Sequence, residues 1–234
     1  MTVYDLIDAT WPAAEFHTVG PWIIRQGLGG GSRVSAATAR SPVGADERSV
    51  AELAMQELGQ SPIFMIRPGD EALDTQLAAA GYVIRDPVTA YAGPVPALAA
   101  LDLPTKTAFL SWPPLAIQAE IWAAGGVGPG RLAIMDRVVG PKVSFLGRVR
   151  DQAAGCAFVA CNADQAMLHA LAVLPEFRRQ GLGRHLLIAA ARWAKAQGGQ
   201  TLSLVVTSAN TGANTLYTSL GMGVVGQYHY RVWP

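Results

Sequence analysis

The fold of this chain is decided by residues 168–184, which read LHALAVLPEFRRQGLGR. An apolar strand ends at Val173, a short basic loop follows, and two glycines open a long helix. The first N–H groups of a helix lack partners and the helix dipole is positive there, so such a terminus attracts anions. Arg178, Arg179 and Arg184 add positive charge, and the glycines let a phosphate approach the backbone. On its own, the pattern is equally consistent with a turn flanked by basic residues.

Regular elements can be placed on both sides of this stretch. Towards the C-terminus we expect a helix over 181–197, a buried strand over 201–206, a short helix over 210–220 and a last hairpin or strand pair over 224–233. Before it we expect a helix over 115–124 and strands over 143–150, 155–160 and 167–173. The N-terminal part repeats this plan more faintly, with strands over 22–25, 34–38 and 63–66 and helices over 47–58 and 71–80. This alternation predicts an α/β fold around a mixed sheet.

Part of the chain resembles another part. With an offset of 140 residues, Gly59 falls on Gly199 and Gly81 on Gly221, and the intervening strand and helix coincide. A duplication explains this match, and chance agreement of two helix–strand units could also produce it. Pro and Gly interrupt the chain around residue 95, so we divide it into two domains, residues 1–104 and 105–234.

Composition and charge exclude several classes of function. Half of the residues are hydrophobic, 15% are charged and the formal net charge is +1, which excludes nucleic-acid binding through bulk electrostatics. No apolar run reaches the roughly 18 residues of a membrane span, and the N-terminus lacks the features of a signal peptide. We therefore expect a soluble, cytoplasmic protein with no membrane or nucleic-acid partner. Cys156 and Cys161 stand at odd spacing, which should place them on opposite faces of a strand and argues against a disulfide or a metal site.

Two signatures in the C-terminal half are similar to those of a known family. The pattern V-x-P-x-F-R-R-x-G-x-G over residues 173–183 resembles the coenzyme A pyrophosphate loop of the GCN5-related N-acetyltransferases (GNAT). The pattern N-x-x-A-x-x-L-Y-x-x-x-G-M over residues 210–222 resembles the second signature of that family, with Met222 where Phe is commoner. The resemblance covers about residues 105–234. It implies two tandem GNAT-like domains with the acyl-CoA N-acyltransferase fold, of which the first is degenerate.

The resemblance implies a coenzyme site and a general acid. Backbone groups from Arg179 to Arg184 would cradle the pyrophosphate, and the pantetheine arm would lie between the strands 167–173 and 201–206. The implied coenzyme-binding residues are Leu171, Val173, Arg178, Arg179, Gln180, Gly181, Leu182, Gly183, Arg184 and Asn210. Tyr217 would stand near the thioester sulfur, where a tyrosine hydroxyl suits protonation of the departing thiolate. At helical spacing, Tyr217 could instead be a core aromatic residue.

The general base is less clearly marked. His169 is expected to share a strand face with Leu171 and Val173, and an imidazole suits proton removal from an ammonium. The run His-Ala-Leu-Ala-Val also resembles the arylalkylamine branch of the family, which has a further histidine where this chain has Met167. A hydrogen-bonded structural role for His169 is the alternative. Water chains, Glu120 or residues of the N-terminal domain could also provide the base.

We therefore expect an N-acetyltransferase that moves the acetyl group of acetyl-CoA directly onto a primary amine of a small molecule or peptide, without a metal. The N-terminal domain should bind no coenzyme, because Asp46 and Glu47 occupy the start of its equivalent helix and Leu77 stands in place of Tyr217. Two alternatives stay open. One is a non-catalytic acyl-CoA-binding sensor or assembly module, and the other is an enzyme with a longer acyl donor.

Overall fold

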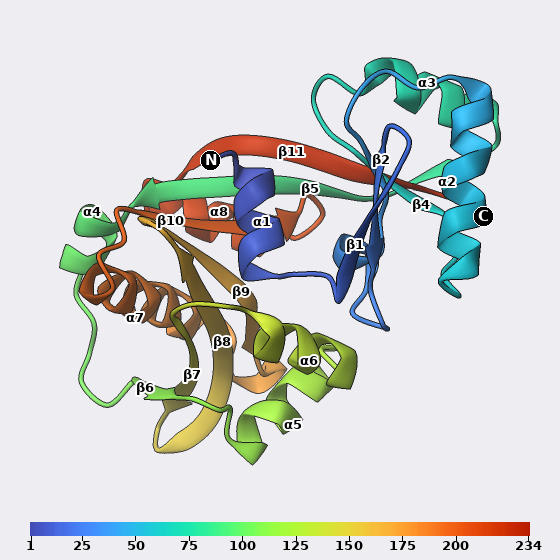
Figure 1. The fold of residues 1–234 in the computed structure, drawn as a ribbon. Helices are drawn as coiled ribbons and strands as arrows, with labels where there is room; N and C mark the ends of the chain where they lie inside the picture. The colour runs from blue at the N-terminus through green and yellow to red at the C-terminus, as the bar shows by residue number, and fades with distance from the viewer.

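The protein has two lobes joined by two long strands. A computed structural model describes residues 1–234, apart from the side chain of Ala45. Figure 1 shows β5 (Val83–Pro94) and β11 (Gly223–Val232) running side by side from one lobe into the other. Both strands belong to one continuous sheet, so backbone hydrogen bonds connect the two lobes.

This sheet has eight strands in the order β4-β11-β5-β10-β9-β8-β7-β6, and a separate sheet has the order β1-β2-β3. Only the pair of β9 and β10 is parallel among the pairs that the described residues form in the large sheet. The remaining strands are β1 (Glu15–Val19), β2 (Trp22–Gln26), β3 (Thr38–Ala39), β4 (Ile63–Ile66), β6 (Ala108–Ser111), β7 (Lys142–Val149), β8 (Gln152–Asn162), β9 (Gln165–Val173) and β10 (Thr201–Thr207).

Helices cover both faces of the sheet in the C-terminal lobe (Figure 1). On one face lies α7 (Leu182–Ala196), and on the other lie α1, α5 and α6. The helices are α1 (Val3–Thr10), α2 (Ala45–Glu57), α3 (Glu71–Ala79), α4 (Val95–Ala100), α5 (Ala116–Ala124), α6 (Pro129–Arg137), α7 and α8 (Thr211–Ser219), with short 3-10 turns η1 (Ser32–Val34) and η2 (Pro175–Phe177). Among the described residues no helix combines the length and apolarity that crossing a membrane requires.

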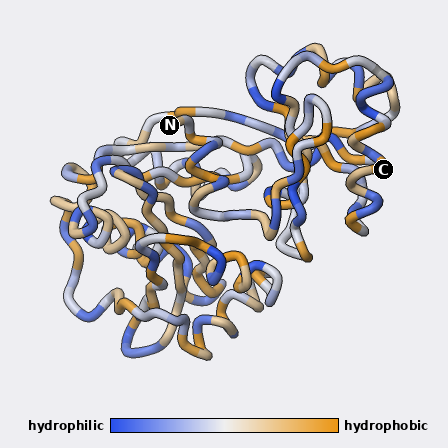
Figure 2. Tube along the Cα trace, in the orientation of Figure 1, coloured by the Kyte–Doolittle hydropathy of each residue, from blue (hydrophilic) through white to orange (hydrophobic). Residues whose placement is uncertain are grey.

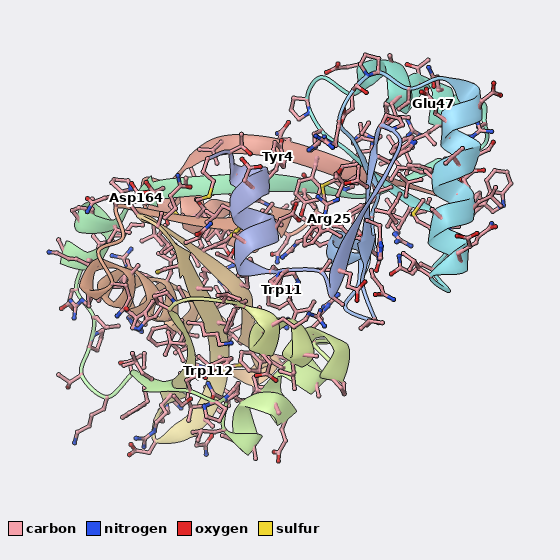
Figure 3. The ribbon with its side chains drawn as sticks, viewed as in Figure 1. Tyr4, Trp11, Arg25, Glu47, Trp112 and Asp164 are labelled. Carbon is pink, nitrogen blue, oxygen red and sulfur yellow. The ribbon has the colours of Figure 1, made fainter. Side chains whose placement is uncertain are left out.

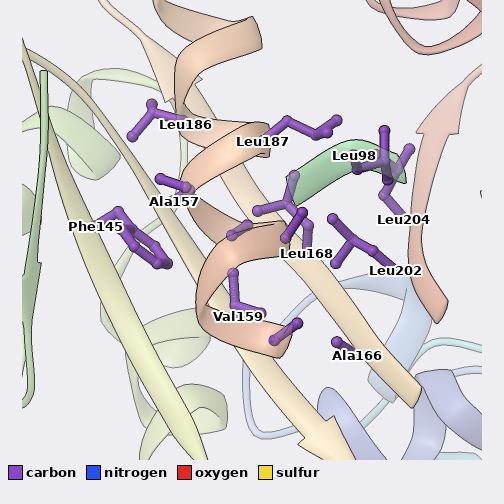
Figure 4. Packing of buried hydrophobic residues seen from close by; sticks show 14 of the residues in the cluster. Leu98, Phe145, Ala157, Val159, Ala166, Leu168, Leu186, Leu187, Leu202 and Leu204 are labelled. Atoms are coloured by element: carbon purple, nitrogen blue, oxygen red, sulfur yellow. The ribbon is translucent and has the colours of Figure 1, made fainter. Parts of the chain in front are cut away.

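The largest apolar cluster lies between α7 and the sheet. Figure 4 shows Leu186 and Leu187 of α7 close to Phe145, Leu168 and Leu202 of the strands. The apolar residues of α7 recur at helical spacing, so one face of the helix is buried. The polar turn between β7 and β8 lies at the periphery of the molecule (Figure 2). Because apolar clusters cover both faces of β8, eight consecutive residues of that strand are buried.

The two halves exchange their last strands. β5 follows α3 in the chain but pairs with β10, and β11 follows α8 but pairs with β4. The register of the two pairs obeys the offset seen in the sequence. Val206 faces Thr89, and Ile66, 140 positions before Val206, faces His229, 140 positions after Thr89. Between β5 and β11, Ala92 faces Gly223 and Val83 faces Val232, which is the same pair related by the offset. The predicted duplication is confirmed.

Several sequence predictions need correction. Residues 224–233 form one long strand rather than a hairpin, because a partner strand from the other half already lies beside them. The strand expected over 34–38 is mostly absent, since Val34 ends the turn η1 and only Thr38 and Ala39 pair with β2. The sequence did not reveal α1, β1, β5, α4, β6 or α6.

The division at residues 104 and 105 stays a prediction. It lies in the mostly exposed connection between α4 and β6, while β5 pairs with strands that come after it. Cys156 and Cys161 do lie in clusters on opposite faces of the sheet as expected, and both are free thiols. Burial raises the pKa of the Cys161 thiol to about 11.

Candidate active site

A cleft opens where β9 and β10 separate. Their parallel pairing ends at Leu168 and Leu204, after which β9 continues beside β8 and β10 continues beside β5. The resulting cleft has a volume of about 960 Å³ and reaches the start of α7. It is lined by the end of β9, the loop that follows, the first turn of α7, and parts of α5 and α8.

Most of the residues predicted from the sequence line this one cleft. They are Leu171, Val173, Arg178, Arg179, Gly181, Leu182, Gly183, Arg184, Asn210 and Tyr217. Gln180 lies outside it, and its side-chain nitrogen donates to the Glu176 carbonyl at 3.2 Å. His169 also lies outside it. Sequence reasoning missed the contributions of Ile121, Ala124 and Gly125, because no local pattern shows that the end of α5 packs beside β9.

The start of α7 is built to receive an anion. Gly181 caps the helix with a φ of +84°, a conformation that glycine adopts without strain. The His185 amide donates to the Gly181 carbonyl at 3.0 Å, so the N–H groups of residues 182–184 have no partner within the helix. Arg178, Arg179 and Arg184 line the same cleft, and no carboxylate does among the described residues. The electrostatics therefore favour a phosphate group.

A bulge in β9 shapes the other end. Phe158 of β8 faces His169 and Cys156 faces Ala172, so β9 carries one extra residue there. Ala170 has a φ of +49°, and its carbonyl accepts a hydrogen bond of 2.7 Å from the indole of Trp122. The extra residue reverses the alternation of side chains.

This bulge overturns the expected face of His169. Leu171 and Val173 pack with the cluster under α7, whereas His169 stacks on Trp11 on the other face. Strict alternation along a regular strand would have kept the three residues on one face, and no glycine marks the bulge in the sequence.

The backbone of β9 beyond Leu168 has free groups toward the cleft. The Leu174 amide donates to the carbonyl of Ala154, which lies in β8, at 2.9 Å. By alternation, the backbone of Val173 faces away from β8, toward the opening. There the Val173 carbonyl accepts from Arg178 Nε at 3.2 Å. The Val173 N–H lies on the same side and can therefore donate to a ligand in the cleft.

Tyr217 combines burial with access to the cleft. The residue is 5% exposed, yet it lines the cleft. Burial raises the pKa of its hydroxyl to about 12, so the hydroxyl is protonated at neutral pH and can donate a proton. Tyr91, from the exchanged strand β5, packs against it with ring centroids 5.7 Å apart. The N-terminal half therefore supports a side chain of the site.

A short hydrogen-bond chain fixes α8, which carries Tyr217. Tyr91 donates through its hydroxyl to Asn214 Oδ1 at 3.0 Å, and Asn214 Nδ2 donates to the Asn210 carbonyl at 2.8 Å. Asn210 caps the helix, since its side-chain oxygen accepts from the Ala213 amide at 3.1 Å. The side-chain oxygen of Asn210 is therefore already engaged in capping.

His169 is buried and has partners on both ring nitrogens. Thr10 Oγ1 donates to the Leu6 carbonyl, so it accepts from His169 Nε2 at 2.9 Å. Arg33 Nη1 lies 3.4 Å from His169 Nδ1. Burial, and then the charge of Arg33, hold the pKa of His169 well below its usual value. The ring is therefore neutral and hydrogen-bonded, which favours a structural role.

A family comparison agrees with this geometry. Residues 110–222 match the family described as the Acetyltransferase (GNAT) family. This part of the chain is a GNAT domain. The whole chain is 25% identical over 237 residues to an uncharacterized N-acetyltransferase of Bacillus subtilis, YobR, covering 97% of this chain and 96% of that protein. A 71-residue stretch is 41% identical to a ribosomal protein bS18 alanine N-acetyltransferase of Haemophilus ducreyi, covering 30% of this chain and 49% of that enzyme.

Solved structures extend the GNAT likeness to both halves. A GCN5-related N-acetyltransferase from Kribbella flavida superposes with a TM-score of 0.71 at 17% identity, covering 99% of this chain and 94% of that one. A tandem GNAT protein from the clavulanic acid pathway superposes with a TM-score of 0.59 at 14% identity, covering 84% and 74%. Residues 110–222 thus belong to an acyltransferase family that uses acetyl-CoA, and the whole chain shares the fold of these two-domain structures.

The N-terminal GNAT-like half differs at the position equivalent to the anion site. Asp46 and Glu47 stand in the first turn of α2, and the Glu47 carboxylate accepts from the Gly44 amide. Leu77 is fully buried where Tyr217 stands in the other half. The acidic side chains satisfy the positive end of α2 and would repel a phosphate.

Proposed function

We propose that the cleft binds acetyl-CoA and that the enzyme transfers its acetyl group to a primary amine of a small molecule or peptide. The observation that carries this proposal is the arrangement of the cleft. Three arginines and free helix N–H groups stand at one end, the opening between β9 and β10 lies in the middle, and Tyr217 borders the same cleft. The pyrophosphate, the pantetheine arm and the thioester would occupy these parts in turn.

Each part has a chemical task. The neutral amine attacks the thioester carbonyl carbon, and main-chain N–H groups near Val173 stabilise the oxyanion. When the carbon–sulfur bond breaks, Tyr217 donates its proton to the departing thiolate. The amine proton passes to a base. His169 as that base stays a prediction, and its burial and its two partners support the structural alternative. Transfer is direct, since no thiol of the described residues lines the cleft.

The N-terminal half, in this proposal, binds no coenzyme. Its acidic helix start and Leu77 support that assignment. Its contribution is to supply β5 and Tyr91 to the site, and to close the sheet face opposite α7 with α1.

A non-catalytic acyl-CoA-binding module is the second candidate. It is favoured by one observation: among the described residues, neither a carboxylate nor a histidine lines the cleft. Such a module would bind acetyl-CoA but release no thiol with any amine.

The deciding experiment measures thiol release from acetyl-CoA across a panel of amines, amino acids and short peptides. We expect amine-dependent release, with kcat at least about tenfold lower in Tyr217→Phe, since general acids typically contribute 10²–10⁴-fold. Tyr82→Phe is the matched control, because that hydroxyl bonds Glu52 in the N-terminal lobe. Calorimetry should find one acetyl-CoA site per chain, with similar affinity in Tyr217→Phe. Binding without release from any amine would favour the non-catalytic module, and two sites per chain would contradict the degenerate N-terminal half.

A further inference from the structure

Arg33 has a guanidinium that no carboxylate neutralises. It lies in η1, which Val34 anchors in the apolar cluster beneath α6. Its Cζ lies 5.8 Å from the ring centroid of Trp11, which follows α1 (Figure 3). In the described part of the chain, arginines 25, 48, 67, 148 and 231 form ion pairs with carboxylates, and Arg33 does not. A half-buried guanidinium without an anion is costly, which points to a ligand.

Two buried polar atoms at this place make no hydrogen bond of good geometry to the described residues, although the phenols of Tyr228 and Tyr230 lie beside the guanidinium. They are Arg33 Nε and the hydroxyl of Tyr228. Burial lowers the pKa of Arg33, but the adjacent phenols of Tyr228 and Tyr230 outweigh that effect and raise it, so the guanidinium is charged. A guanidinium only donates hydrogen bonds, and a phenol can also donate. A phenol is a neutral acceptor, so the guanidinium still lacks an anion, and a carboxylate fits both its charge and its geometry.

The surroundings add positive charge. Arg85 Nη2 donates to Ser32 Oγ at 3.0 Å, next to Arg33 in the chain, and the Arg131 side chain lies beside Gly31. Neither arginine takes part in an ion pair among the described residues. The nearby Asp8 is already bound to Arg25 at 2.6 Å. The field at η1 thus attracts an anion.

Arg33 lies beside β9, the strand that borders the cleft. Arg33 contacts His169, the first residue of β9 after its pairing with β10 ends, and Ala172 of the same strand lines the cleft. Three residues of a strand span about 10 Å. His169 lies on the face opposite α7, so Arg33 lies across the sheet from the pyrophosphate end. An acceptor approaching from this face would bring its far end to Arg33.

Resting on the proposed function, we propose that Arg33 and Tyr228 bind a carboxylate of the amine acceptor. The acceptor is then an amine that also carries a carboxylate, such as an ω-amino acid or a peptide with a free C-terminus. Arg33 in this role determines specificity and does not take part in the chemical step.

The test compares acids with their amides. 4-Aminobutanoate, 6-aminohexanoate and glycylglycine are each assayed beside the corresponding amide, with wild type, Arg33→Gln, Arg33→Lys and Arg40→Gln. We expect wild type to have a KM at least about tenfold lower for one or more acids than for the matching amide. Arg33→Gln should abolish this preference by raising the KM of the acid, with kcat within about threefold. Arg33→Lys should keep part of it, and Arg40→Gln, an exposed arginine of the same half, should change it less than about threefold.

The outcomes separate this inference from the proposed function. Equal KM values for acids and amides in wild type, or an equal loss for both in Arg33→Gln, would overturn the carboxylate site while leaving the transferase intact. If no amine is acetylated, calorimetric binding of 6-aminohexanoate to the coenzyme A complex decides. Binding that Arg33→Gln removes supports the site, and no binding to wild type overturns it. Acetyl-CoA affinity and the thermal midpoint report whether Arg33→Gln folds, and Tyr228→Phe serves as the second variant.

Discussion

Ala170 adopts a left-handed backbone conformation at a position where the sequence has no glycine. An alanine in that conformation costs roughly 1–2 kcal/mol, and the hydrogen bond from Trp122 to its carbonyl offsets part of that cost. The side-chain pattern of the strand predicts neither the bulge nor the face of His169. Both depend on Trp122 and on the pairing with β8, which are remote in sequence. Most of the predicted cleft residues, in contrast, could be read from two local signatures, whereas those on and directly after α5 could not.

The buried state of His169 should make stability depend on pH. The folded-state pKa is depressed, so the unfolded chain binds a proton as pH falls below about 6.5 and the folded chain does not. The free energy of unfolding should therefore fall on acidification from pH 7, by at most about 1.4 kcal/mol per pH unit from this residue.

His169→Gln keeps a donor for Thr10 and cannot titrate, so its free energy of unfolding should vary less with pH over that range. Urea unfolding at several pH values measures the difference, and His17→Gln is the control. A structural role predicts kcat at pH 7.5 within about threefold of wild type. A loss near 10²-fold at unchanged stability would instead identify His169 as the base.

At the scale of elements, the helices and strands with strong local sequence signals could be located from the sequence. Apolar spacing and glycine stops identified α3, α7, α8, β4 and β10 within a few residues. Short or solvent-exposed elements such as β6 and α6 were missed, because burial by distant segments stabilises them rather than their own pattern. The place of β5 could not be predicted at all, since its partners β10 and β11 follow it by more than 100 residues.

The pairing of β8 and β9 supports the cleft, and Gly155 of β8 leaves no room for a side chain. A Cβ at this residue would lie 2.6 Å from the Ala172 carbonyl oxygen, a backbone atom that can move only with the strand. Gly155→Ala should lower the free energy of unfolding by about 1–3 kcal/mol and weaken acetyl-CoA binding.

Gly223→Ala, in β11, is the matched control, since no atom lies within 4 Å of the Cβ that it adds. Its stability should change by less than about 1 kcal/mol. Denaturant unfolding and calorimetry provide the two measurements. Unchanged stability and affinity in Gly155→Ala would show that β9 is not held as closely as the structure indicates.

At the scale of the whole molecule, the two halves share one eight-stranded sheet. β5 of the N-terminal half pairs with β10 and β11, and β11 of the C-terminal half pairs with β4 and β5. Neither half can therefore unfold without exposing strand edges of the other. We expect a single cooperative thermal transition in which the calorimetric and van't Hoff enthalpies agree. Two resolved transitions would show instead that the lobes unfold as separate domains, as the division at residues 104 and 105 implies.

The exchange of strands also has a consequence for mass action. Two separate chains that traded their last strands would form a dimer, and such a dimer comes apart on dilution. Here the connection between α4 and β6 keeps both halves in one chain, so each finds its partner strand at an effective concentration in the millimolar range. Each chain can therefore pair all of its strands at any concentration of the protein in the cell.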